Sequence, residues 1–270
     1  MRKLYAIPLY VILFAFITSC AELINIAKLP TATGSAPLSG NEIIEGLKTA
    51  LLVGTDTSVS VTSRINGFYR DEAIKILLPP EAQKIYANRN NALLRMAGLD
   101  KKLEDAVLAI NRAAEDAASE AGPIFKNAIK GLTISDGYSI LRGTNPAAQT
   151  SAGTFDSTAA TGYLRSTTYL QLENAFSPKI NASLNKTLVG NYSPNQIWNT
   201  LTGTYNAIAN KSIGIIEPVA TTDLGKYVTQ KALDGIFFKV AIEEKEIRNN
   251  PAKWAATAVG NILQRVFGKK

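Results

Sequence analysis

The chain has 270 residues, and its 29 lysines and arginines against 22 aspartates and glutamates give a net charge of +7 at neutral pH. Hydrophobic residues make up 46% of the sequence, which is enough for a sizeable core in one domain. There is no histidine and only one cysteine. The composition therefore excludes catalysis by His–Ser or His–Cys pairs and the usual imidazole metal sites.

The first twenty residues have the pattern of a bacterial export signal. Arg2 and Lys3 give a positive start, residues 4–17 are almost wholly apolar, and two small residues precede Cys20. The apolar core is too short to span a membrane as a helix, which needs about 20 apolar residues. An aliphatic residue, two small residues and then Cys20 resemble the lipobox of bacterial lipoproteins. The resemblance implies that residues 1–19 are a signal peptide and that Cys20 carries the lipid.

The lipid sets the expected location and partners of the mature chain. Removal of Arg2 and Lys3 with the signal leaves 27 basic and 22 acidic residues, a net charge of +5. Acyl chains on Cys20 would hold the protein to a membrane. Glu22 is not an aspartate, which favours the outer membrane, facing the periplasm, over retention at the inner membrane. We expect no nucleic-acid partner in that compartment. The alternative is an ordinary signal peptide that ends near a chance cysteine.

A helical domain is predicted after a short tether. Residues 20–37 are expected to form this flexible tether, because the 29–37 stretch is mostly small and polar and is broken by prolines. Ser39 and Glu42 then form a capping-box pattern ahead of apolar residues at helical spacing. The domain is therefore expected to span residues 38–268. Residues 67–80 are expected to form a loop, within which the 74–78 stretch is extended and packed without forming part of a sheet.

Seven further helices are predicted from caps, apolar periodicity and stop signals. Pro123 is expected to kink or divide the second of them, and Pro178 to interrupt the fourth. No stretch predicts a series of strands, so the sequence indicates an all-α domain of about eight or nine helices. Gly98 is expected to stop the first of these helices, and Asp100 to cap the second. The expected ranges are about 80–96, 100–128, 133–143, 156–188, 193–208, 221–248 and 250–267.

Short motifs follow one another along this domain in a fixed order. They include NRAAE at 111–115, YLRSTT at 163–168, YVTQKALDGIF at 227–237 and EEKEIR at 243–248. In type and spacing they resemble the DUF4197 family, a bacterial family of unknown function. The resemblance covers nearly the whole mature chain and implies an exported, helical, single-domain protein. It implies no activity.

Lys231 and Asp234 are the first candidates for a polar site. Lys231 falls inside the apolar arc of its predicted helix, where an ionised side chain needs a partner. Asp234 lies one turn on and can pair with it. Arg165 can reach a carboxylate on another helix, and Asp234 and Glu115 are the candidates. These residues form either a ligand-binding pocket or structural ion pairs that fix helix register.

Other charged residues have a more ordinary explanation. Arg112 and Glu115 lie one turn apart and predict a solvated or second-layer bridge. The acidic residues of the 243–246 stretch resemble a pair for acid–base work. Lys245 and Arg248 interleave them, however, so a solvated helix face is expected.

Together these features favour a non-enzymatic envelope lipoprotein that binds an envelope protein or a small ligand, and such a binding surface requires an exposed apolar patch. A carrier or sensor of a lipid or other apolar molecule is the alternative, and it requires an enclosed cavity of several hundred Å³ with Lys231 or Arg165 at the rim. A carboxylate hydrolase would require Glu115, Asp234 or Glu244 to face one another across a cleft. No EF-hand-like loop is present, and no cofactor or metal is expected.

Overall fold

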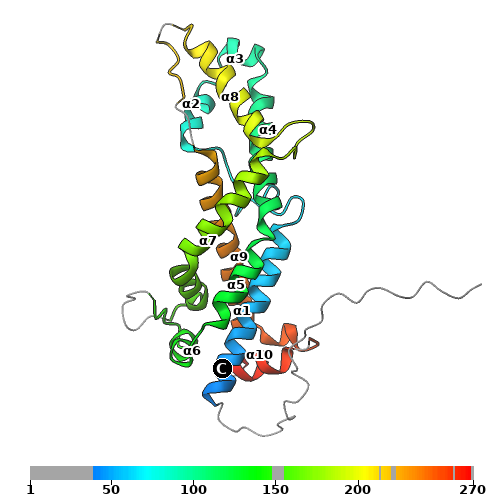
Figure 1. Ribbon diagram of the computed structural model, residues 1–270, viewed down its shortest axis with the longest axis vertical. Helices are drawn as coiled ribbons and strands as arrows, with labels where there is room; N and C mark the ends of the chain where they lie inside the picture. The colour runs from blue at the N-terminus through cyan, green and yellow to red at the C-terminus, as the bar shows by residue number, and fades with distance from the viewer. Residues whose placement is uncertain (1–38, 148–154, 213, 220–222, 258, 269–270) are drawn as a thin grey trace, which may run out of the picture. The chain divides into compact units, whose positions relative to one another are not determined.

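The computed structural model describes residues 39–147, 155–212, 214–219, 223–257 and 259–268. These residues form ten α-helices and two 3-10 helices, and no strand beyond one isolated bridge (Figure 1). The all-α prediction of about eight or nine helices is confirmed, because two of the ten helices have only five residues each. Cys20 and the predicted tether lie outside the described residues. The α-helices are α1 Gly40–Thr62, α2 Gln83–Ala87, α3 Ala92–Met96, α4 Leu99–Ala118, α5 Ala121–Lys130, α6 Ile134–Leu141, α7 Ala159–Asn185, α8 Pro194–Ala209, α9 Leu224–Asn249 and α10 Gly260–Phe267, and the 3-10 helices are η1 Pro80–Ala82 and η2 Pro251–Trp254.

Four long helices form the centre of the domain. α9 packs between α1 and α7, and α4 packs against α7, α8 and α9. Figure 1 shows α6 and α10 beside the first half of α1, and α3 and α8 beside the start of α4. The large side chains buried between the helices include Phe125, Phe176 and Phe237. Burial of each such side chain contributes about 1.5–3 kcal/mol to stability. Among the described helices, none is both long and apolar enough to cross a bilayer.

The first helix begins as its sequence predicts. The Ser39 hydroxyl oxygen accepts a hydrogen bond from the Glu42 amide at 3.3 Å, and the Glu42 carboxylate accepts one from the Ser39 amide at 2.9 Å. This reciprocal capping box satisfies two amides that the helix itself leaves without partners. The side chains of Thr133 and Asp223 likewise accept hydrogen bonds from backbone amides at the starts of α6 and α9.

The single helix predicted over 80–96 is wrong. A turn separates α2 from α3, and the Asn91 side chain accepts a hydrogen bond from the Leu93 amide at 3.0 Å to begin the second helix. Gly98 adopts a left-handed φ of 69° and directly precedes α4. Asp100 therefore does not cap α4 but lies in its first turn, where a negative charge suits the helix dipole.

The two helix prolines behave differently. Pro123 lies in the first turn of α5, after α4 has ended, so the predicted division is confirmed. The interruption predicted at Pro178 is wrong, because α7 continues through it from Ala159 to Asn185. Phe176 and Ile180 are fully buried on either side of the proline. Their packing holds the helix together across the hydrogen bond that the proline cannot donate.

Residues 74–78, called here the 74–78 segment, are extended and packed as predicted. Ile74, Ile76 and Leu78 are buried, whereas Leu77 is 60% exposed, so alternate side chains face the core. Asn111 of α4 supplies the backbone partners. Its side-chain oxygen accepts from the Ile76 amide at 2.9 Å and its side-chain nitrogen donates to the Ile76 carbonyl at 2.7 Å. A helix side chain thus replaces the neighbouring strand that this segment lacks.

Candidate functional site

The exposed face of α9 carries Lys231 and Asp234. Lys231 is exposed, and Phe238 and Ile242 on the same side of the helix are 45% and 43% exposed. The prediction that Lys231 lies within a buried arc is therefore wrong. The buried side of α9 is instead centred on residues such as Ile236 and Val240, against which α1 and α7 pack.

Lys231 and Asp234 line an open hollow of about 280 Å³ between α9 and the 74–78 segment. At one end the Tyr227 hydroxyl donates to the Leu77 carbonyl at 3.0 Å. At the other end Gly235 lets the segment approach closely, since a Cβ atom there would lie 3.3 Å from the Ile74 Cβ. Lys231 is four residues from both Tyr227 and Gly235, so it lies midway along the hollow.

Burial raises the pKa of Tyr227 above its ordinary value, and the charge of Glu81 adds to the effect. The phenol therefore stays protonated at neutral pH and continues to donate to the 74–78 segment. This contact fixes the separation between α9 and the segment at that end of the hollow.

Arg165 of α7 forms the cross-helix ion pair with Asp234 that its position predicted. Its guanidinium also lies 4.9 Å from the centre of the Tyr169 ring and 5.3 Å from that of Phe237. The predicted pairing of Lys231 with Asp234 is not formed. Among the described residues Lys231 makes no ion pair, which leaves its ammonium as an uncompensated charge beside the hollow.

Glu115 does not join the hollow. Its carboxylate accepts hydrogen bonds from the Phe68 and Tyr69 amides, both at 3.1 Å, and pairs with Arg112. Arg112 also donates to the Asn66 side chain at 2.9 Å. Since Glu115 is buried, the pair is not a solvated bridge, and the second-layer bridge is the alternative that the structure supports. The pair fastens the loop that follows α1 to α4.

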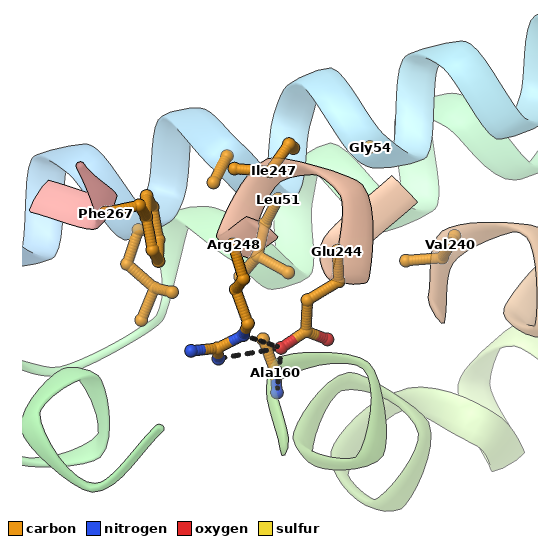
Figure 2. Close-up of a pocket in the computed structure, with 10 residues that line it drawn as sticks. Leu51, Gly54, Ala160, Val240, Glu244, Ile247, Arg248 and Phe267 are labelled. Carbon is orange, nitrogen blue, oxygen red and sulfur yellow. Dashed lines mark hydrogen bonds and ion pairs between the residues drawn. The ribbon is translucent and has the colours of Figure 1, made fainter. Parts of the chain in front are cut away.

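Glu244 was missed as a buried residue, because its neighbours suggested a solvated face. It is only 8% exposed and accepts hydrogen bonds from the Ala160 amide at 3.0 Å and from the amide and hydroxyl of Thr161 at 2.8 and 2.7 Å. Figure 2 shows Arg248 beside it, donating from two nitrogens at 2.9 and 2.8 Å. Glu244 thus caps α7 from another helix. Its spacing from buried Val240 and Ile247 was the available signal.

A family model described as "Protein of unknown function (DUF4197)" matches residues 37–268. The chain belongs to this family. The match covers every helix from α1 to α10, so the hollow lies within the DUF4197 domain. No curated protein and no solved structure matches the chain. The DUF4197 description assigns no activity.

A small space lies in the core of this DUF4197 domain beside the Glu244–Arg248 pair. It lies between α1, α9 and α10, is lined by residues that include Leu51, Ile247 and Phe267, and has a volume of about 10 Å³ (Figure 2). This volume accommodates about one water molecule. It is far smaller than the enclosed cavity that a carrier of apolar molecules requires.

The three carboxylates considered for hydrolysis are each paired with an arginine. Glu115 pairs with Arg112, and Asp234 and Glu244 pair with arginines of their own. They therefore do not form the pair of facing carboxylates that acid–base hydrolysis would require. Within the described ranges, no cluster of three or more acidic, histidine or cysteine side chains is arranged to hold a metal ion.

Proposed function

We propose that this DUF4197 protein is a lipid-anchored protein of the bacterial envelope whose helical domain binds a partner through the exposed face of α9, without catalysing a reaction. The anchor is supported by the charged and apolar signal pattern that ends at Cys20. Cys20 is the only cysteine, so it has no disulfide partner within the chain. Diacylation with a third acyl group on the new amino terminus would give stable attachment, and Glu22 favours the outer membrane.

The binding role rests on one observation above all, the uncompensated ammonium of Lys231 beside an open hollow of about 280 Å³. Hollows that combine apolar walls with a few polar groups are where proteins take up ligands. Phe238 and Ile242 extend the same face with apolar side chains that remain exposed. The buried carboxylates of Glu115 and Glu244, in contrast, form hydrogen bonds and ion pairs that hold helices and loops in place.

The anchor is tested with the Cys20→Ser variant in cell fractionation. Wild-type protein should sediment with the membranes and stay there after an alkaline carbonate wash, whereas the variant should leave them or remain uncleaved. Glu22→Gln is the matched control and should behave as wild type does at the membrane. If the Cys20→Ser variant is processed and retained like wild type, the lipid anchor is wrong.

The binding role is tested by placing a photo-reactive amino acid at Phe238 or Ile242 in living cells. Leu93 is the control position, because it is 61% exposed but belongs to α3, which packs against α4 and α8. Positions 238 and 242 should give discrete cross-linked products that position 93 does not give. Equal labelling at all three positions would mean that α9 has no special role.

A further inference from the structure

The 74–78 segment turns two free backbone groups towards α9. Asn111 occupies both the amide and the carbonyl of Ile76 on the α4 side. The described peptide bonds are all trans, and in a trans peptide the carbonyl of one residue and the amide of the next point in opposite directions. The Lys75 carbonyl and the Leu77 amide must therefore point away from Asn111. No described residue donates to that carbonyl or accepts from that amide.

The Lys75 carbonyl and the Leu77 amide are spaced so that both can form hydrogen bonds with one residue of an added peptide chain. In a parallel pairing, a single residue donates its amide to the carbonyl before the opposing residue and accepts from the amide after it. Here the opposing residue is Ile76, and the two groups belong to Lys75 and Leu77. Addition of an extended peptide to such an edge is a recurrent mode of recognition.

The hollow suits the end of a chain better than a strand that runs through it. Tyr227 bridges one end by donating to the Leu77 and Leu78 carbonyls, and Gly235 meets Ile74 at the other. Lys231 lies between these ends and brings a positive charge to the hollow that Leu77 also lines. A negatively charged group is therefore the best hydrogen-bond acceptor for the Leu77 amide.

The rest of the charge around the hollow is already compensated. Asp234 pairs with Arg165, and the Lys75 ammonium lies 3.4 Å from Glu72 and 4.9 Å from the centre of the Tyr69 ring. One unpaired cation remains among the described residues that line the hollow. A ligand with a single negative charge beside an amide matches this arrangement.

Building on the proposed binding role of α9, we propose that this hollow binds the C-terminal end of a peptide. The last amide of the peptide donates to the Lys75 carbonyl. The terminal carboxylate accepts from the Leu77 amide and pairs with the ammonium of Lys231. Charge-assisted hydrogen bonds of this kind are shorter and stronger than neutral ones, so the carboxylate dominates recognition.

The test compares N-acetyl-alanyl-alanine with its C-terminal amide, by titration into the full mature chain in detergent micelles. Affinity is measured by calorimetry, and the Leu77 amide is followed by nuclear magnetic resonance. The free acid should bind about tenfold more tightly or better and should shift the Leu77 resonance. Lys231→Gln should remove most of this preference, whereas Lys245→Gln, an exposed lysine on the same helix, should keep it.

A second variant removes the backbone donor. Leu77→Pro deletes the amide, and because the side chain is exposed and the segment extended, the fold should be retained, as circular dichroism can check. This variant should lose the preference for the free acid. N-acetylalanine contains both proposed contacts and should bind as the dipeptide does, whereas acetate has the carboxylate but no amide. Equal binding of acetate would overturn the peptide assignment.

Equal affinity for the free acid and the amide, or unchanged affinity in Lys231→Gln, would overturn the inference. The membrane fractionation of Cys20→Ser and the cross-linking at Phe238 and Ile242 do not depend on this chemistry. If both succeed while the free acid shows no advantage, only the assignment of the ligand fails.

Discussion

The Glu244→Ala substitution is predicted to destabilise the domain severely. The Glu244 carboxylate accepts five hydrogen bonds, three from the first turn of α7 and two from Arg248. Alanine would leave the guanidinium buried without its partner, since Arg248 is also only 8% exposed. Breaking a buried pair in this way costs about 3–5 kcal/mol. The free amides of α7 would add to that cost, because Thr158 provides no side-chain cap.

The Glu244→Gln substitution removes the negative charge but keeps the size of the side chain. Glutamine also keeps one acceptor oxygen, but its NH₂ group would face amide or guanidinium donors. We expect a smaller loss, about 2–3 kcal/mol, from the donors left unsatisfied. The difference between the two variants reports how much of the effect is due to packing.

The assay is urea unfolding followed by circular dichroism and by the fluorescence of the buried Trp198 and Trp254. Glu246→Ala is the control, because this carboxylate is more exposed and lies 3.6 Å from Lys253. It should change the free energy of unfolding by about 0.5 kcal/mol or less. If Glu244→Ala costs no more than Glu246→Ala, the capping of α7 by Glu244 is not what holds these helices together.

Two further predictions concern stability. Asn111→Ala should cost about 2–3 kcal/mol in urea unfolding, because both Ile76 backbone groups lose their buried partner; a neutral result would refute the strand-like role of Asn111. For Asp116, burial raises the pKa, but hydrogen bonds from Lys186 and Ser183 outweigh it and the pKa is lowered. The stabilisation is present above the ordinary pKa of 3.8 and is lost as the pH falls through the lowered value. Asp116→Asn should therefore lower Tm at pH 7 by an amount that shrinks below about pH 4, and a pH-independent difference would contradict this.

Helix starts were predictable because their signals are local. The capping boxes at Ser39 and Ser193 each join residues three positions apart, so the sequence contains donor and acceptor together. The Asp223 cap is equally local. The effect of Pro178 could not be predicted in this way, since α7 tolerates it only through the tertiary packing of its neighbours.

The site could be predicted only in part. The position of Arg165 indicated a carboxylate on another helix, and Asp234 is that partner. The environment of Lys231 was misjudged, because periodicity locates the apolar side of α9 but not which part of it α1, α7 and the 74–78 segment leave open. Glu244 reaches amides more than eighty residues away, and no local pattern reveals such a partner.

The most direct test of the proposed function is the mass of the mature amino terminus. Protein should be purified from bacterial membranes, digested and analysed by mass spectrometry. We predict an N-terminal peptide that begins at Cys20, with diacylglycerol on the sulfur and an acyl group on the amine. An unmodified Cys20, or a chain that begins at another residue, would contradict the lipid-anchored envelope protein proposed here.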